Sequence, residues 1–189
     1  SMDLLQRFAY GVSREQALAL QGAERALVLD FAHPGSSSIG AYRTALALAE
    51  ELARKTKGYL WDEETREAFT AQAWHERRIV TWNDGIPDIT NQTVIHAYRG
   101  DNMVRAITLG MAKFGLPDIV ATDFSWSSSR GMGNLINGFA QALLEGQSLM
   151  TAGQFDLDVR SIRHDDIRAA QTTNLLSNAS SVAKLTLVN

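Results

Sequence analysis

Two stretches of the chain repeat apolar residues at the spacing of an amphipathic helix. In the first, one face gathers Tyr42, Ala45, Leu46, Ala49, Leu52 and Ala53. Gly58 follows this stretch, and glycine is well suited to end a helix. The second stretch starts near Ser128, and its apolar face gathers Met132, Leu135, Ile136, Phe139, Ala140 and Leu143. We expect both helices to turn these faces toward a core.

Weaker signals predict three further helices. A helix over Arg14–Gln21 is indicated by Ser13 and Gln16, which have the spacing of a capping box. Thr70 is suited to cap a helix that reaches about Trp82. The last predicted helix covers Asp165–Leu176.

Strand patterns lie between the predicted helices. Val94–Arg99 and Met103–Leu109 flank the turn residues Gly100–Asn102, which predicts a hairpin. The compact apolar run Arg25–Phe31 predicts a buried strand. Shorter strands are expected at 59–61, 67–69, 119–124, 155–159 and 183–188.

This order of elements predicts an α+β fold. Hairpins require antiparallel pairing, so we expect a mixed, largely antiparallel sheet of about six strands with helices packed on it. The length of 189 residues fits a single domain over 1–189, with 1–24 as a helical N-terminal extension. We also expect the chain to be a fragment of a longer protein.

Composition removes several function classes. The chain has no cysteine, which excludes disulfides, cysteine-ligated zinc and a thiol nucleophile. A net charge of −3 argues against a nucleic-acid partner, which would require a basic face. No apolar run is long enough for membrane insertion, and no signal-peptide pattern is present. The compartment stays open between cytoplasm and periplasm.

The best candidate for ligand binding is the Ser127–Gly133 loop, which leads from a predicted strand into a predicted helix. Small residues at a helix N-terminus expose backbone N–H groups to a phosphate or carboxylate. Trp126, Ser128, Ser129 and Arg130 are the candidate binding residues, with Arg130 adding positive charge. The alternative interpretation is purely structural, with a serine capping the helix and the glycines allowing close packing.

His33 and His96 complete the set of candidate ligand-binding residues. His33 follows a predicted strand, and His96 lies within one. Each can act as a general base, or it can be an ordinary hydrogen-bonded histidine. No two of the four histidines stand at metal-ligand spacing, so no metal site is predicted. The acidic run Asp62–Glu64, with Glu67, offers paired carboxylates for acid–base chemistry or for a hard cation. The alternative is that Glu63, Glu64 and Arg66 form a solvated turn.

Five motifs resemble an uncharacterised bacterial domain-of-unknown-function family. They are WDEETREAFT (61–70), AWHERR (73–78), TVIHAYR (93–99), TLGMAKFGLPDIV (108–120) and MGNLIN (132–137). The resemblance covers most of residues 25–165, and it implies that a second small domain follows as a C-terminal companion. It carries no assigned activity, so it transfers no site residue.

We therefore expect a non-enzymatic binding or protein-interaction domain, with a protein or peptide as partner and no cofactor. No complete catalytic constellation is present, so no catalytic residue is assigned. The alternative is a hydrolase or transferase acting on an anionic small molecule bound at the Ser127–Gly133 loop. In that alternative His96 or His33 is the base, and Lys113 or Arg99 is the electrostatic partner.

Overall fold

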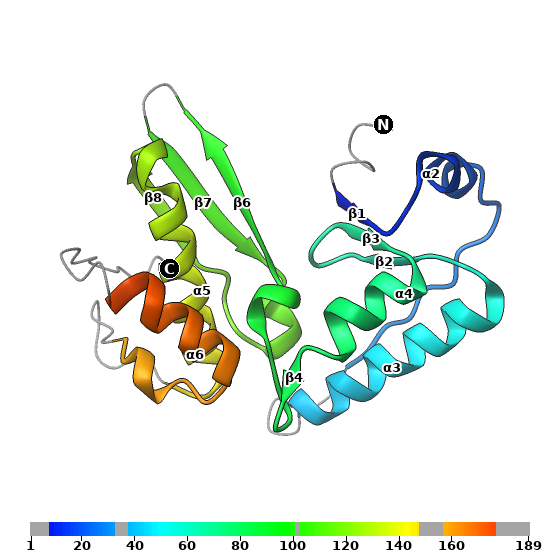
Figure 1. The fold of residues 1–189 in the computed structure, drawn as a ribbon. Helices are drawn as coiled ribbons and strands as arrows, with labels where there is room; N and C mark the ends of the chain where they lie inside the picture. Colours follow the sequence, from blue (N-terminus) through cyan, green and yellow to red (C-terminus); the bar gives the residue numbers. More distant parts are fainter. Residues whose placement is uncertain (1–7, 33–37, 101–102, 148–156, 177–189) are drawn as a thin grey trace. The chain divides into compact units, whose positions relative to one another are not determined.

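A computed structural model of the chain describes residues 8–32, 38–100, 103–147 and 157–176 (Figure 1). Contacts divide it into two compact units, Ser1–Gly85 and Ile86–Asn189. The expectation of a single domain over 1–189 stays a prediction. His33 and the strand expected at 183–188 lie outside the described residues.

The first unit contains a three-stranded sheet of short strands in the order β1-β3-β2. β1 (Ala9–Tyr10) pairs parallel with β3 (Glu67–Phe69), and β2 (Leu60–Asp62) pairs antiparallel with β3. The sequence predicted strands at 59–61 and 67–69, and β2 differs from the first by one residue at each end. The register of the β2–β3 pair places Asp62 directly opposite Glu67.

Two helices of the first unit begin directly after the capping residues that the sequence predicts. α2 (Arg14–Gln21) starts after Ser13, whose backbone N–H donates to Gln16 Oε1 at 2.8 Å in the capping box. α3 is the long helix Ser38–Thr56. α4 (Ala71–Trp74) is capped by Thr70 and continues as a π-helical turn, η2 (His75–Ile79).

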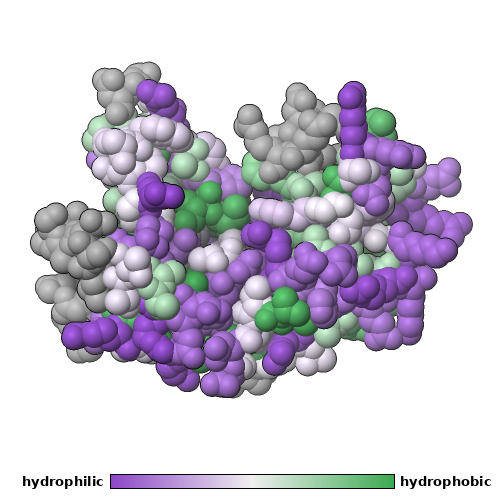
Figure 2. Space-filling model, viewed as in Figure 1, coloured by the Kyte–Doolittle hydropathy of each residue, from purple (hydrophilic) through white to green (hydrophobic). Residues whose placement is uncertain are grey.

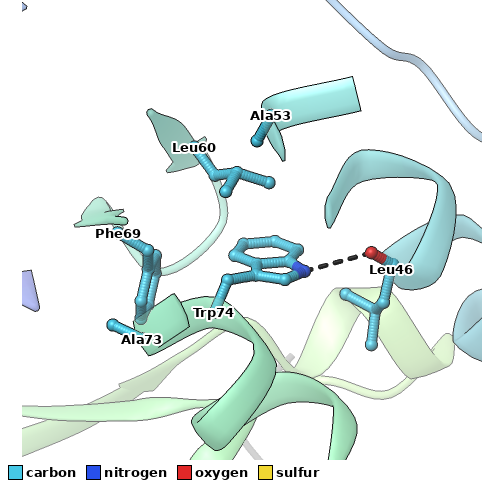
Figure 3. Close-up of a cluster of buried hydrophobic side chains, with 6 residues drawn as sticks. All are labelled: Leu46, Ala53, Leu60, Phe69, Ala73 and Trp74. Atoms are coloured by element: carbon cyan, nitrogen blue, oxygen red, sulfur yellow. Dashed lines mark hydrogen bonds between the residues drawn. The ribbon is translucent and has the colours of Figure 1, made fainter. Parts of the chain in front are cut away.

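The core of the first unit lies between α3, α4 and the short strands (Figure 3). Trp74 is at its centre, and its indole Nε1 donates to the backbone carbonyl of Leu46 at 3.1 Å. The bond satisfies a buried polar atom that would otherwise be costly. The buried members of the cluster are Leu46, Ala53, Leu60, Phe69, Ala73 and Trp74.

A second three-stranded sheet, in the order β6-β7-β8, lies in the second unit (Figure 1). β6 (Val94–Arg99) and β7 (Val104–Leu109) form the predicted antiparallel hairpin. β8 (Val120–Phe124) pairs antiparallel with β7 through an irregular register near Asp123, whose φ is 60°. Between β7 and β8 runs the 3₁₀ turn η4 (Met111–Phe114).

Helix α5 (Ser129–Leu144) follows the short 3₁₀ turn η5 (Trp126–Ser128) and packs on β8 and α6. It buries the predicted apolar face, including Ile136, Phe139 and Leu143. α6 (Asp165–Gln171) continues as the π-helical turn η7 (Thr172–Leu176), as the sequence predicted for one helix over this range. The remaining elements are β4 (Trp82–Asn83), β5 (Ile86–Pro87), η3 (Ile89–Asn91) and η6 (Val159–Ser161).

The α+β class and the mixed, largely antiparallel pairing are confirmed. The expected sheet of about six strands is instead divided among three small sheets, the third being the two-stranded β4–β5 pair. Among the described residues no helix combines the length and apolarity that crossing a bilayer requires.

Candidate functional site

Four of the predicted ligand-binding residues lie together at the start of α5. Trp126 is 57% exposed, and Ser128 and Arg130 are also exposed. The hydroxyl of Ser128 is engaged with Ser125 Oγ at 2.9 Å and does not cap the helix. Among the described residues the Oγ of Ser129, which is shielded from solvent, has no hydrogen-bond partner. The interpretation that a serine caps this helix is therefore wrong. The backbone N–H groups of Ser128 and Ser129 donate instead to the carbonyls of Ser125 and Trp126, so η5 and α5 form one helical run.

His96 occupies the middle of β6, with its ring beside that of Tyr98 at a centroid distance of 6.4 Å. Register and alternation place both rings on the sheet face opposite to Val104 and Ala106, which are buried. On this second face Tyr98 and Arg105 are exposed and Ile107 is half-buried. Figure 2 shows that hydrophobic residues reach the surface of the molecule in patches among hydrophilic ones. The role of His96 as a base for a ligand at the Ser127–Gly133 loop stays a prediction.

At the end of the β6–β7 hairpin an open hollow of about 490 Å³ is present. Its charged lining residues are Arg99, Arg105 and Asp123. Both arginines are exposed, and within the described residues neither forms an ion pair. The hollow thus offers two guanidinium groups beside the exposed ring of Tyr98. The sequence predicted Arg99 only as an electrostatic partner for an anion bound at the Ser127–Gly133 loop.

The strongest exposed apolar feature is the stretch Ala26–Phe31, called the apolar segment below. All residues from 21 to 32 are exposed, with Leu27 at 70% and Val28 at 75%. Within the described part of the chain the segment makes no backbone hydrogen bond. It runs as an irregular connection between α2 and α3 (Figure 1).

The prediction of a buried strand over Arg25–Phe31 is therefore wrong. Composition alone favours a strand there, but a strand needs an open sheet edge beside it. In the first unit the described strands pair only with one another, in the order β1-β3-β2, and none of them pairs with residues 25–31. The apolar segment is left with strand-forming side chains and no strand neighbour among the described residues.

A buried charge cluster in the first unit was missed by sequence reasoning. The side chain of Arg78 is fully buried, and its Nη2 donates to Asp62 Oδ2 at 2.9 Å and to Glu67 Oε2 at 2.8 Å. The same nitrogen donates to Thr65 Oγ1 at 3.1 Å. Its guanidinium also lies over the ring of Phe69 at 4.6 Å. The turn residues Glu63, Glu64 and Arg66 are exposed, as the solvated-turn interpretation expects, whereas the carboxylates of Asp62 and Glu67 are buried on one cation.

The cluster changes the acidity of two nearby tyrosines. Burial raises the pKa of Tyr42 far above its ordinary value, and the carboxylate of Asp62 raises it further. Burial and the charge of Glu67 likewise raise the pKa of Tyr10, although Arg77, 4.1 Å over its ring, opposes the shift. Two carboxylates on one arginine leave the cluster negative, so the phenols stay protonated. Both tyrosines pack against the buried cluster around Trp74.

Among the described residues no group of three or more histidine, aspartate or glutamate side chains is placed to hold a metal ion. Comparisons with models of protein families, with curated proteins and with solved structures give no match to this chain. The resemblance to a bacterial domain-of-unknown-function family therefore stays a prediction.

Proposed function

We propose that this chain is a non-enzymatic protein-interaction domain whose contact surface includes the apolar segment. The observation that carries the proposal is the exposure of four large apolar residues in one short stretch, Leu27, Val28, Leu29 and Phe31. Contiguous apolar surface on a soluble protein is typical of an interaction site. Single exposed apolar residues are common and would not support the same conclusion.

Backbone chemistry supports the same proposal. Residues 25–32 are exposed and lack backbone hydrogen bonds within the described part of the chain. A partner gains main-chain hydrogen bonds as well as apolar contact when it pairs with such a stretch. Asp30 is the only charged residue inside the segment, so a partner has little charge to desolvate there.

Site-specific photo-cross-linking tests the proposal. A photo-reactive amino acid replaces Val28, and in a matched control it replaces Lys55, which is exposed on α3 outside the apolar segment. In cells that express the chain we expect a protein adduct from position 28 and none from position 55. Absence of an adduct at position 28, or equal adducts at both positions, would contradict the proposal.

The alternative function, a hydrolase or transferase for an anionic small molecule, is favoured by one observation at α5. No side chain among the described residues caps the helical run that η5 begins and α5 continues, and the exposed Arg130 lies near the start of that run. Such a terminus attracts anions. Phosphate at a hundred times its dissociation constant would add about 2.7 kcal/mol to stability, and Arg130→Ala should reduce that gain. No thermal shift with phosphate would sink this alternative.

A further inference from the structure

We propose that the apolar segment of one copy adds as a parallel strand to the edge strand β6 of a second copy. This inference rests on the proposed function and names its partner. It depends on three features of the described residues, namely an unpaired donor stretch, an edge strand of matching length, and opposite charges at corresponding ends. Two copies that exchange segments in this way form a closed, symmetric dimer.

The donor has the residue pattern of a strand. Leu27, Leu29 and Phe31 alternate with Ala26, Val28 and Asp30, so one face is large and apolar and the other is smaller. Leucine, valine and phenylalanine in such alternation pack well on a half-buried sheet. Because the stretch is exposed along its whole length, no packed structure must be broken before it pairs.

The acceptor is β6, which ends the strand order β6-β7-β8 and pairs only with β7 among the described strands. Its six residues can pair with residues 25–30, that is Arg25 and the first five residues of the apolar segment. The C-terminal half of β6 is accessible to solvent, since Ala97, Tyr98 and Arg99 are all exposed. An edge strand of this kind is a template for pairing with another chain.

Charge selects one register. When residues 25–30 run parallel to 94–99, Asp30 falls beside Arg99, which lines the hollow and has no ion pair within the described residues. In the same register Leu27 and Leu29 fall beside His96 and Tyr98. Opposite charges on neighbouring strands stabilise a sheet.

Full-length antiparallel registers are less favourable. One of them, with residues 26–31 antiparallel to 94–99, places Asp30 beside Ile95. The side chain of Ile95 lies on the same face of the sheet as the buried β7 residues, where a carboxylate has no counter-charge. Shifting that register by one residue sets Arg25 beside Arg99, and like charges directly opposite each other destabilise the pair. The parallel register is therefore the one that pairs Asp30 with an arginine.

Charge reversal tests the pairing. The molar mass of the full chain is measured by light scattering over a wide range of concentrations, and we expect a monomer–dimer equilibrium. Asp30→Arg and Arg99→Asp should each raise the dimer dissociation constant about tenfold or more, because attraction becomes repulsion. The combined variant restores the charge pair and should return the dissociation constant close to that of the wild type. Both positions are exposed, so circular dichroism should show all variants folded.

Several results would overturn the inference. They are a monomer at every concentration, a dimer that neither single variant weakens, and a double variant that stays monomeric although folded. The photo-cross-linking at position 28 separates this failure from that of the proposed function. A cross-linked adduct with a different protein, together with a monomeric chain, keeps the interaction function and removes the second copy as its partner.

Discussion

At the scale of single residues, the first unit depends on Arg78. Its guanidinium neutralises part of the charge on Asp62 and Glu67, which face each other across the β2–β3 hairpin. We predict that Arg78→Ala destabilises the protein by about 3–5 kcal/mol, because it leaves two buried carboxylates without a cation. Urea unfolding followed by tryptophan fluorescence measures this loss.

A surface ion pair provides the control for Arg78. Arg54 pairs with Glu50 at 2.7 Å on α3, and its side chain is 48% exposed. Arg54→Ala should lower the free energy of unfolding by less than about 1 kcal/mol, because an exposed ion pair adds little to stability in water. Equal losses for the two variants would show that the Arg78 cluster is not buried as described.

Tyr42 gives stability a specific dependence on pH. Its pKa is raised by burial and by Asp62, so the folded state holds the phenolic proton to higher pH than the unfolded state does. Above the unfolded pKa of about 10, unfolding releases a proton, and the free energy of unfolding falls as pH rises. We predict that Tyr42→Phe weakens this alkaline fall, measured as the difference in urea midpoint between neutral and alkaline pH. A Tyr98→Phe control changes an exposed tyrosine, and an identical pH dependence in Tyr42→Phe and wild type would refute the assignment.

At the scale of elements, Asp118 fixes the η4 turn between β7 and β8. Its Oδ1 accepts from Thr108 Oγ1 at 2.9 Å and from the backbone N–H of Met111 at 3.2 Å. Thr108 Oγ1 in turn accepts from the backbone N–H of Ile119 at 2.7 Å. Asp118→Ala should cost about 1–3 kcal/mol, because buried donors lose their acceptor. Asp118→Asn keeps an Oδ1 acceptor and should cost clearly less, and equal losses for the two variants in urea unfolding would contradict this role.

Elements whose determinants are close in sequence could be predicted. The capping box at Ser13 and Gln16 predicted α2, and it is present as expected. The turn at Gly100 predicted the β6–β7 hairpin. The helical spacing that includes Ile136 and Phe139 predicted the buried face of α5. In each case residues only a few positions apart determine the structure.

Features that depend on distant residues could not be predicted in the same way. Arg78 falls within the helix predicted from Thr70 to about Trp82, and nothing in that local pattern shows that its side chain is buried on carboxylates contributed by β2 and β3. A signal was available, since two acids facing each other in a hairpin require a cation between them. The strand predicted at Arg25–Phe31 is absent because no described strand pairs with that stretch, and a local pattern does not show whether a pairing partner exists.

At the scale of the whole molecule, an apolar segment that is open in the free chain should add little to its stability. Leu27 is 70% exposed, whereas Leu46 is 4% exposed in the core around Trp74. We predict that Leu27→Ala changes the free energy of unfolding by less than about 0.5 kcal/mol in dilute solution. The same substitution at Leu46 should cost about 2–5 kcal/mol. A large loss at Leu27 would mean that the residue is packed in the free chain.

Backbone hydrogen exchange of residues 25–32 shows whether the apolar segment is open in the free chain, since it reports whether these amides are hydrogen-bonded. We predict fast exchange in dilute monomer and slow exchange once a second protein, here a second copy at high concentration, covers the apolar segment. Amides that exchange slowly at every concentration would contradict this prediction by showing that the segment is already paired within its own chain. Amides that exchange fast under all conditions, in the cross-linked complex as well, would show that the segment binds no partner.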